Sequence, residues 1–336
     1  MKKRGIGLAA GALVIILLLA AGISGQMSCS KTDFMLDTVV TVTARGIHAK
    51  SAVNAALDTV REVEAQTSAF LPESPIVQLN QNGNAHLPTD AMSCLKIAQE
   101  IAQKTNSSFD PTVKPLMALW NIQNGQGTVP DAQAIADALP CVGWDKLRIN
   151  EADQTVSFAK EGMGVDLGGV AKGYSADRAA ERMRECGVKS ALIDLGGNIY
   201  ALGKRRGRDW LVGLRDPDGT QGSYFGTVSV SDCAVVTSGG YERYFVQDGI
   251  TYHHILNPKT GYPADAGLKS VTILSGSSAR ADALATACYV MGAEAALALI
   301  EATEETEAVL VDAAHTVYAT SGAGFTLTSE AYHMAN

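Results

Sequence analysis

Helix and strand patterns mix along this chain without strict alternation, and this feature constrains its fold more than any other. β-branched residues cluster at 38–44, whereas apolar residues recur at helical spacing over 49–67. A second helix is predicted near 90–104, before a turn at 105–112 that contains Pro111. Because a doubly wound sheet needs regular alternation of strands and helices, the pattern predicts an α+β fold.

Short strands dominate the second half of the chain. One is predicted at 190–197. Further strands are predicted at 210–215, 225–230, 234–237, 243–247, 251–256 and 270–275. The motif Asp-Leu-Gly-Gly occurs twice, at 166–169 and at 194–197, and we expect both copies to end a strand in a tight glycine turn.

Helices are predicted between these strands. The first covers 174–186, and Gly187 closes it as a C-terminal cap. Ser277 or the serine after it caps a second helix, which ends at Gly292. A third helix follows at 293–302.

The length and the composition predict a large core and two lobes. The chain has 336 residues, of which 46% are hydrophobic and 18% are charged. A chain of this length can bury a large core and commonly divides in two. Residues 121–131 contain Gly125, Gly127 and Pro130 and read as a surface loop, so we place a candidate lobe boundary there.

Residues 1–28 read as a signal peptide or a membrane anchor. Positive charges at positions 2 to 4 precede an almost wholly apolar run from Ile6 to Ile23. Cys29 favours a lipoprotein signal, in which this cysteine is acylated and becomes the new N-terminus. An uncleaved helix and simple cleavage are the alternatives. We expect the functional domain, residues 29–336, to lie outside the cytoplasm, tethered to the cell membrane by a lipid on Cys29 or by the uncleaved helix.

The acidic charge argues against a nucleic-acid partner. The formal net charge is −8, and it becomes −11 (−8 − 3) without residues 1–28, which carry three positive charges and no negative ones. Binding a nucleic-acid backbone requires clustered lysine and arginine. The five cysteines after Cys29 are widely scattered, and buried free thiols are the simpler interpretation.

The stretch GVDLGGVAKGY at 164–174 places a carboxylate, two adjacent glycines and a lysine close together. It lacks the spacing of both best-known phosphate motifs. Its glycines still let the backbone turn N–H or C=O groups toward a ligand, and Lys172 adds a positive charge where the next helix begins. An ordinary strand-turn-helix with a surface lysine explains the same residues.

Asp282 and Thr286 form a candidate metal site. Positions i and i+4 lie on one face of a helix, so the carboxylate and the hydroxyl point to the same spot. Both are hard oxygen ligands suited to Mg²⁺ when a backbone carbonyl, phosphates and waters complete its coordination. The alternative is a helix-capping aspartate with a threonine that bonds back to its own helix.

His254 is a candidate general base. It follows an apolar strand and precedes an Asn-Pro turn, and histidine is the side chain best suited to accept a proton near neutral pH. A structural role is the simpler interpretation for His253 or His254 taken alone. The run TSGG at 237–240 offers hydroxyl and N–H groups to a phosphate, although such runs are common in turns.

The order of these motifs resembles the ApbE family of FAD:protein FMN transferases. The resemblance covers almost everything from Phe34 to Val311. It rests on the blocks LDTVVTV, SAFLPESPIVQLN, SSFDPTVKPLMALW, VDLGGVAKGYSAD, IDLGGNIYALG, VTSGGYERYF, HHILNPKTGYP and ADALATACYVMG. It implies a two-lobed α+β fold, with mixed and antiparallel sheets flanked by helices and an FAD groove between the lobes.

The family implies a magnesium-dependent reaction in which FAD is split at its pyrophosphate. The FMN half passes to a serine or threonine hydroxyl of a target protein, and AMP leaves. If water attacks instead, the same site is a magnesium-dependent FAD pyrophosphatase that yields FMN and AMP. A flavin-binding lipoprotein without turnover is the third hypothesis.

The resemblance also implies roles for individual residues. His254 takes the role of the catalytic base. Mg²⁺ is held by Asp282, Thr286 and the backbone carbonyls of Gly169 and Ala285. The implied FAD contacts are Leu36, Phe70, Ser108, Phe109, Asp110, Asp166, Lys172, Thr237, Ser238, Ile255 and Leu256.

The chain departs from the family pattern at two places. Many members carry Met-Gly-Thr where this chain reads Leu36-Asp37-Thr38, so Leu36 would replace the methionine that touches FAD. We expect acceptor proteins, membrane or secreted redox proteins, to carry a motif of the type Ser/Thr-Gly-Ala-Ser/Thr. The chain's own TSGAG at 320–324 has Gly324 at the acceptor position, so we predict a β-turn there and no self-flavinylation.

Overall fold

A nine-stranded sheet forms the centre of the fold in the computed structural model, which describes residues 27–122, 127–220 and 222–335. Its strands, in spatial order, are β1 (Ser28–Met35), β2 (Thr38–Arg45), β6 (Ser190–Leu195), β7 (Asn198–Gly203), β10 (Cys233–Gly239), β13 (Leu268–Ser275), β14 (Thr306–Asp312), β15 (Thr316–Ala319) and β17 (His333–Met334). Neighbouring strands are antiparallel, apart from the parallel pair β15 and β17. The predicted α+β fold with mixed and antiparallel sheets is confirmed.

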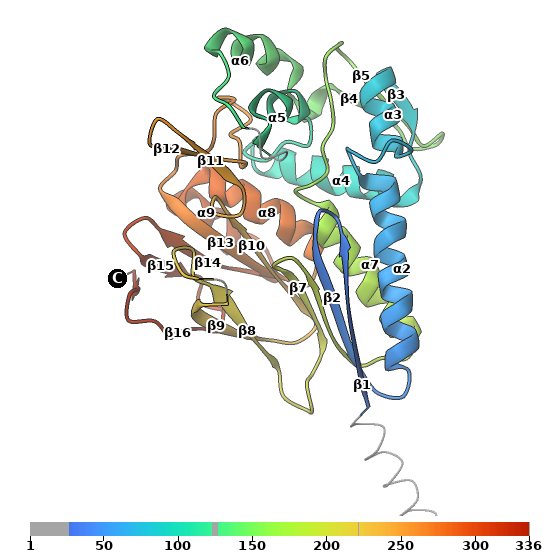
Figure 1. Ribbon diagram of the computed structural model, residues 1–336, viewed down its shortest axis with the longest axis vertical. Coiled ribbons are helices and arrows are strands. Elements are labelled where there is room, and N and C mark those ends of the chain that lie inside the picture. Colours follow the sequence, from blue (N-terminus) through green and yellow to red (C-terminus); the bar gives the residue numbers. More distant parts are fainter. Residues whose placement is uncertain (1–26, 123–126, 221, 336) are drawn as a thin grey trace, which may run out of the picture.

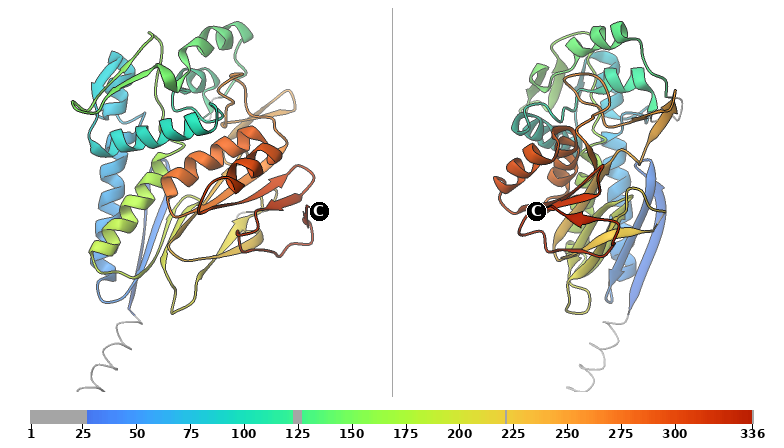
Figure 2. Two further views of the ribbon diagram at one scale, coloured as in Figure 1. Left: turned by 180° about the vertical axis from the view of Figure 1, so that it is seen from behind. Right: turned by 90° about the vertical axis from the view of Figure 1, so that its left-hand side faces the viewer.

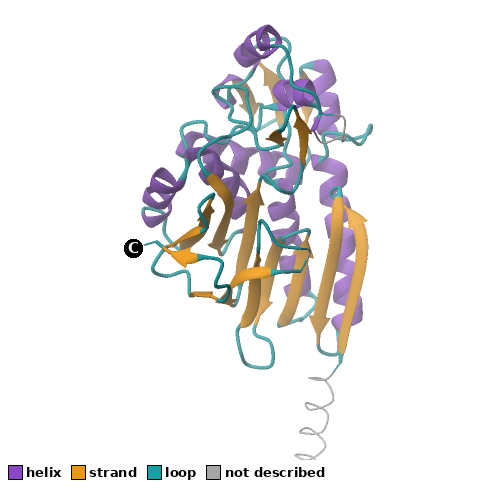
Figure 3. Ribbon diagram, turned by 60° about the vertical axis from the view of Figure 1, so that its left-hand side comes forward, coloured by secondary structure: helices purple, strands orange, loops and turns teal. Residues whose placement is uncertain are grey.

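Helices cover one face of this sheet (Figures 1 and 3). They are α2 (Ala49–Thr67), α7 (Ala171–Glu185) and α8 (Ser278–Met291), with α9 (Ala293–Glu301) packed beside α8. In β2 the side chains of Val40, Val42 and Ala44 are buried in alternation, as expected for a strand with one face under a helix. The helix α8 is buried on nearly all sides, because its many alanines let neighbouring elements approach closely.

A smaller antiparallel sheet covers the opposite face. It consists of β16 (Phe325–Leu327), β9 (Tyr224–Val230) and β8 (Trp210–Arg215). Phe225 and Trp210 from this sheet share a second apolar cluster with Val235, Leu274 and Val309 of the large sheet. The large sheet is therefore sandwiched, and its interior strand β13 is buried along most of its length.

The remaining helices gather at one end of the molecule, at the top of Figure 1. They are α3 (Pro75–Asn82), α4 (Thr89–Lys104), α5 (Lys114–Trp120) and α6 (Ala132–Ala138), joined by a small sheet of β3 (Asn84–His86), β5 (Thr155–Phe158) and β4 (Leu147–Asn150). The hairpin of β11 (Tyr244–Gln247) and β12 (Ile250–His253) lies nearby. The two helices that flank the predicted loop at 121–131, α5 and α6, share one apolar cluster around Trp120. The division into lobes at that loop stays a prediction.

Two carboxylates tie the first turns of α7 and α8 together. Asp177 of α7 accepts hydrogen bonds from the backbone N–H groups of Ser278 (2.8 Å) and Ala279 (3.0 Å) at the start of α8. Asp282 of α8 accepts one from the N–H of Gly173 (3.0 Å) at the start of α7. Each helix thus satisfies N–H groups that the other leaves without an intrahelical partner. The negative charges also lie at the positive ends of both helices.

Gly173 permits this close approach of the two helices. A Cβ atom at this position would lie 2.1 Å from the carbonyl oxygen of Ser278. No side chain tolerates such a contact with a rigid backbone, so the glycine is required by space. Figure 2 shows α7 and α8 side by side from behind.

The first Asp-Leu-Gly-Gly copy, at 166–169, does not end a strand, so that prediction is wrong. The N–H and C=O groups of Val165 both bond to the side-chain amide of Asn80 (2.7 and 2.8 Å), which takes the place of a neighbouring strand. The turn then leads directly into α7, which begins at Ala171, three residues before the predicted start at Tyr174.

The second copy, at 194–197, does follow a strand, as predicted. β6 ends at Leu195, and Gly196 and Gly197 have φ angles of 67° and 91°. In both copies the first aspartate accepts a hydrogen bond from a following glycine N–H, at 2.8 Å for Asp166 and 3.0 Å for Asp194.

The positions of one further strand and one turn can be compared with the sequence predictions. The strand predicted at 251–256 ends at His253, because the chain folds back so that Ala264 donates to the carbonyl of Ile255 (2.9 Å). The turn predicted at 320–324 is confirmed, since the N–H of Ala323 bonds to the carbonyl of Thr320 (3.1 Å).

The apolar run from Ile6 to Ile23 lies outside the described residues. Within residues 27–122, 127–220 and 222–335, no helix has the length and apolar character needed to span a membrane. Cys29 lies in β1, opposite Ala44 of β2, and its side chain packs at the margin of the core.

Replacing Gly173 with alanine is expected to destabilise the protein by about 3 kcal/mol or more, because α7 and α8 must separate to admit the methyl group. Urea unfolding measures the free energy. Gly276→Ala is the control, since a Cβ there meets nothing within 4 Å, and its effect should stay within about 0.5 kcal/mol. Equal unfolding midpoints for the two variants would show that the helix contact is not tight.

Candidate functional site

A buried carboxylate lies where the starts of α7 and α8 meet. The side chain of Asp282 is only 4% exposed, and one of its oxygens accepts from Gly173 as described. Its Oδ1 atom lies 3.7 Å from the ammonium group of Lys172. The carboxylate is therefore held between a backbone amide and the side chain of a lysine.

The glycine corner, residues 165–169, adjoins α8 at Thr286. A Cβ atom on Gly169 would lie 3.7 Å from Thr286 Oγ1. That hydroxyl donates to the carbonyl of Asp282 (3.4 Å) and lies 3.3 Å from the hydroxyl of Ser238 in β10. The two segments proposed to share a metal are thus neighbours. The threonine does bond back to its own helix, whereas the aspartate caps α7 instead of α8.

Gly168 and Gly169 leave little space for a side chain, and their backbone conformation does not require glycine. Neither has a positive φ. A Cβ on Gly169 would lie 2.9 Å from the ring of Phe109, and one on Gly168 would lie 2.9 Å from Asp166 Oδ1. Lys172 donates to the carbonyl of Gly168 (3.2 Å), which keeps the corner folded onto the first turn of α7.

The donor atoms at this corner fit a hard cation that takes other ligands from a substrate. Asp282 and Thr286 offer a carboxylate and a hydroxyl, Gly169 lies next to them, and Ala285 is fully buried between them on α8. No group of three or more His, Cys, Asp and Glu residues in the described chain could hold a metal. One carboxylate with neutral oxygens suits Mg²⁺ bound together with phosphates and water.

A lysine that the sequence did not single out connects two predicted FAD contacts. Lys114 Nζ lies 4.0 Å from the centre of the Phe70 ring and 3.5 Å from Asp166 Oδ2. Phe70 is 57% exposed, whereas Asp166 is buried. The cation–π contact and the ion pair thus hold the solvent-exposed ring of Phe70 close to the glycine corner. No spacing rule relates positions so far apart in the sequence.

The segment Ser108-Phe109-Asp110 has mixed roles. Phe109 packs on Gly169, as its close approach shows. Both carboxylate oxygens of Asp110 already accept hydrogen bonds, one from Thr112 (2.8 Å) and the other from the N–H of Trp144 (3.0 Å). Burial raises the pKa of Asp110, and these bonds oppose the rise. Ser108 is half-buried in the preceding turn.

The adjacent histidines differ in which ring nitrogens are engaged. His253 uses both: Nε2 lies 3.0 Å from the carbonyl of Ala264, and Nδ1 accepts from the N–H of Ile255 (3.3 Å). Among the described residues, His254 has a partner only at Nδ1, which lies 3.2 Å from the carbonyl of Arg243. A carbonyl can only accept, so Nδ1 of His254 carries the proton and Nε2 keeps a free lone pair.

The environment keeps His254 neutral. Burial lowers the pKa of His254 to about 4, and the positive charges of Arg243 and Lys172 act in the same direction against a hydrogen bond that opposes them. The effect of Lys172 also places this histidine within electrostatic reach of the glycine corner. At neutral pH the imidazole can therefore accept a proton.

Arg243 connects His254 to the tip of the β1–β2 hairpin. Its guanidinium pairs with Asp37 (2.9 Å) and donates to the carbonyl of the same residue (3.2 Å). Leu36 and Asp37 have φ angles of 54° and 56°, and the N–H of Leu36 donates to Glu64 (2.7 Å). No sequence pattern predicts this connection, which brings Leu36 toward the histidine.

The other predicted contacts lie further from this corner. Thr237 bonds to Thr272 (2.8 Å), and its neighbour Ser238 points to the opposite face of the sheet, where Thr286 lies. Ile255 and Leu256 are buried in two different apolar clusters. The side chain of Ser238 is thus beside the candidate metal ligands, whereas that of Thr237 is not.

Comparisons with known proteins agree with the fold and identify the family. A sequence model of the ApbE family matches residues 36–310. The FAD:protein FMN transferase of Treponema pallidum is 36% identical over 93% of both chains, and that of Klebsiella pneumoniae is 33% identical over 79% of this chain and 83% of its own. The crystal structure of the ApbE protein from Thermotoga maritima superposes with a TM-score of 0.82 at 30% identity, covering 88% of this chain and 97% of its own.

Acid is expected to destabilise the protein partly through His254. In the unfolded chain its pKa returns to 6.5, so between pH 6.5 and 4 the unfolded state binds the proton more tightly and stability falls as pH falls. From pH 7 to 5, the unfolding free energy should drop by about 1 to 2 kcal/mol more in the wild type than in His254→Gln. Other titrating groups cancel in this difference. An equal drop in both proteins would mean that the buried imidazole titrates normally.

Proposed function

Since this chain belongs to the ApbE family and is an FAD:protein FMN transferase, we propose that it uses Mg²⁺ to move FMN from FAD to a serine or threonine hydroxyl of another protein, releasing AMP. The observation that supports this proposal best is the unbonded Nε2 of His254, within electrostatic range of Lys172, which bonds to the corner of oxygen donors. The transfer chemistry needs both parts, a base for a weakly acidic hydroxyl and a neutralised pyrophosphate.

The glycine corner would receive the pyrophosphate. Asp282, Thr286 and the carbonyls of Gly169 and Ala285 would hold Mg²⁺, which when bound neutralises phosphate charge and stabilises the charge that develops in the transition state. Lys172 would add a second positive charge to the same oxygens. Without such cations, an acidic protein would repel the dinucleotide.

His254 would act on the acceptor hydroxyl. The oxygen of the serine or threonine attacks the phosphorus of the FMN half, and its proton passes to Nε2 of His254. The bond between this phosphorus and the bridging oxygen breaks, and that oxygen leaves as part of AMP. The carbonyl of Arg243 stabilises the resulting imidazolium through its bond to Nδ1.

The flavin half would extend toward the exposed ring of Phe70. Lys114 and Asp166 hold this region in place, and Leu36 supplies an apolar surface from the hairpin tip. Phe109 and Ser238 complete the wall on the two sides of the corner. The FAD groove between lobes and the contacts of Ser108, Asp110, Thr237, Ile255 and Leu256 are proposed on the family resemblance alone.

The acceptor is proposed to be a membrane or secreted redox protein with a Ser/Thr-Gly-Ala-Ser/Thr motif. The enzyme itself is proposed to be extracytoplasmic and tethered to the membrane through residues 1–28 or a lipid on Cys29. Support for the tether comes from the charged start and apolar run of the sequence.

The base assignment predicts that His254→Gln retains FAD but transfers FMN at least 100-fold more slowly, because a positioned base contributes on the order of 10² or more. The assay mixes FAD, Mg²⁺ and a domain carrying the acceptor motif and measures covalent flavin by in-gel fluorescence. His253→Gln is the matched control and should transfer far better. Free FMN and AMP without acceptor would indicate a pyrophosphatase, and bound but intact FAD would indicate a flavin carrier.

The metal assignment predicts that Asp282→Asn needs at least tenfold more Mg²⁺ for half-maximal transfer, because the one carboxylate among the proposed protein ligands is lost. The amide can still accept from Gly173, so the fold should persist. Asp177→Asn, the equivalent change in the other half of the helix pair, should leave the magnesium requirement as in the wild type. An unchanged requirement in Asp282→Asn would remove this residue from the metal site.

A further inference from the structure

A cationic hollow lies at the end of the large sheet opposite His254. Its volume is about 680 Å³. Its lining comes from the end of β2, the start of α2, the turn after α7 and the loop between β7 and β8, which meet at the bottom of Figure 1. Arg45, His48, Lys189, Lys204 and Arg206 line it, and no carboxylate does among the residues that the structure describes.

Most of the lysines and arginines among them have no acidic partner. Lys204 pairs with Asp209 (3.1 Å), but Arg45, Lys189 and Arg206 make no ion pair or side-chain hydrogen bond within the described chain. The Nε atom of Arg45 is buried without any partner. In a protein of net charge −8, three unpaired cations around one hollow mark a site for a negative ligand.

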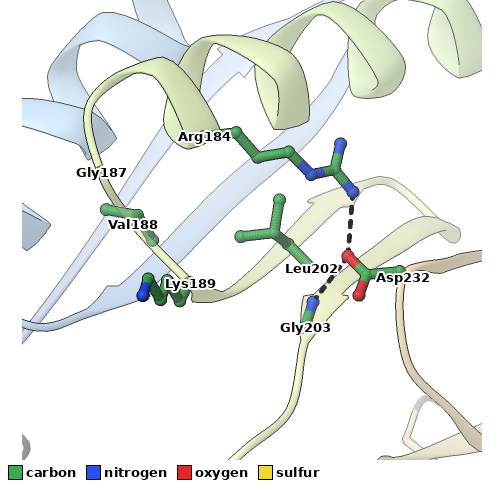
Figure 4. Close-up of a pocket in the computed structure, with 7 residues that line it drawn as sticks. All are labelled: Arg184, Gly187, Val188, Lys189, Leu202, Gly203 and Asp232. Atoms are coloured by element: carbon green, nitrogen blue, oxygen red, sulfur yellow. Dashed lines mark hydrogen bonds and ion pairs between the residues drawn. The ribbon is translucent and has the colours of Figure 1, made fainter.

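In a neighbouring hollow, by contrast, an arginine is paired with a carboxylate. This hollow shares Gly187, Val188 and Lys189 with the first hollow, and Figure 4 shows Arg184 beside it. Arg184 pairs with Asp232 (2.9 Å), which also accepts from the N–H of Gly203 (3.0 Å). Arg184 thus has its counter-charge within the protein, unlike Arg45 and Arg206.

The chain enters the described structure at the rim of the cationic hollow. The N–H of Gly46, one of its lining residues, donates to the carbonyl of Met27 (2.9 Å), the first described residue. The side chains of Met27 and Ile47 are 50% and 63% exposed. The 26 residues that precede Met27 include the apolar run from Ile6 to Ile23.

We propose that the cationic hollow binds the phosphate headgroups of anionic phospholipids and seats this end of the molecule on the membrane. Cations with exposed apolar side chains beside them match a bilayer surface, where headgroups and acyl chains lie at different depths. A free phosphate would explain the cations but not the exposed Ile47, which is present whether or not the chain is cleaved before Cys29. The proposal goes beyond flavin transfer, and it uses the proposed tether only to bring the bilayer to this end.

The same geometry sets the orientation of the active site. β2 runs from Thr38, beside the hairpin tip that pairs with Arg243, to Arg45 in the hollow. Eight residues of strand span about 25 Å. With the hollow on the lipid, His254 is held near the end of the sheet that lies away from the membrane surface.

The test uses the full chain reconstituted into vesicles of phosphatidylcholine alone or mixed with phosphatidylglycerol, at physiological ionic strength. Hydrogen exchange of the backbone at 44–50 and 203–208 is the readout. A basic residue near an anionic surface strengthens binding roughly fivefold. We expect exchange in these two segments to be at least fivefold slower in the anionic vesicles, with added salt removing the difference.

The variant Arg45→Gln with Arg206→Gln should lose this protection. A matched control, Arg148→Gln with Lys160→Gln, removes the same charge from two exposed residues in the part of the molecule around β4 and should keep it. Equal exchange in both vesicles, or protection that survives the first double variant, would overturn the proposal. Protection by inorganic phosphate in phosphatidylcholine vesicles would overturn it too, by showing a small-anion site.

Vesicle flotation at physiological ionic strength separates the hollow from the tether. A chain that floats with phosphatidylcholine vesicles is anchored independently of headgroup charge. If the chain floats only with anionic vesicles, the anchor is refuted. If the double variant Arg45→Gln with Arg206→Gln then no longer floats, the result still supports lipid binding at the hollow. Transfer of FMN in detergent should be unaltered in both double variants, because neither changes a residue of the candidate active site.

Discussion

The exchange of carboxylate caps between α7 and α8 is the interaction on which the rest of the structure depends. Asp177 and Asp282 each lie at the start of the helix to which they do not belong, and together they fix the distance between the two helix ends. Placing carboxylates out of water is costly unless hydrogen bonds replace the lost hydration. Here backbone amides do so, and the result is that Lys172, Gly169 and Thr286 meet at one corner.

The two histidines show how hydrogen bonding decides function between neighbours. Both rings are taken out of water, and burial lowers the pKa of each. Both ring nitrogens of His253 form hydrogen bonds with the backbone around it, so this histidine fixes the loop that returns from Ile255 to Ala264. His254 is oriented by a single bond and leaves the other nitrogen available. The different roles of the two histidines depend on three-dimensional contacts, and the sequence His-His alone does not predict them.

Much of the fold could be predicted from local patterns, because strand alternation and helix periodicity reflect burial. The helix at Ala49–Thr67 and the turn at Gly196 are examples. The first Asp-Leu-Gly-Gly copy was misassigned because a distant side chain, Asn80, occupies its backbone groups. Lys114 and Arg243 were missed for the same reason: their partners lie far away in the sequence, and no spacing rule reports such contacts. The positions of Asp282, Thr286 and Gly169 followed from motif order, but their burial and contacts did not.

The strand β2 acts as a spacer with a fixed length. If lipid lies at Arg45, an acceptor hydroxyl must rise about 25 Å above the bilayer to meet His254, roughly eight residues of extended chain. Substrates whose modified residue sits close to their own transmembrane helix would then need a linker of at least that size. Linker length, and not only the sequence around the hydroxyl, would decide which membrane proteins this enzyme can modify.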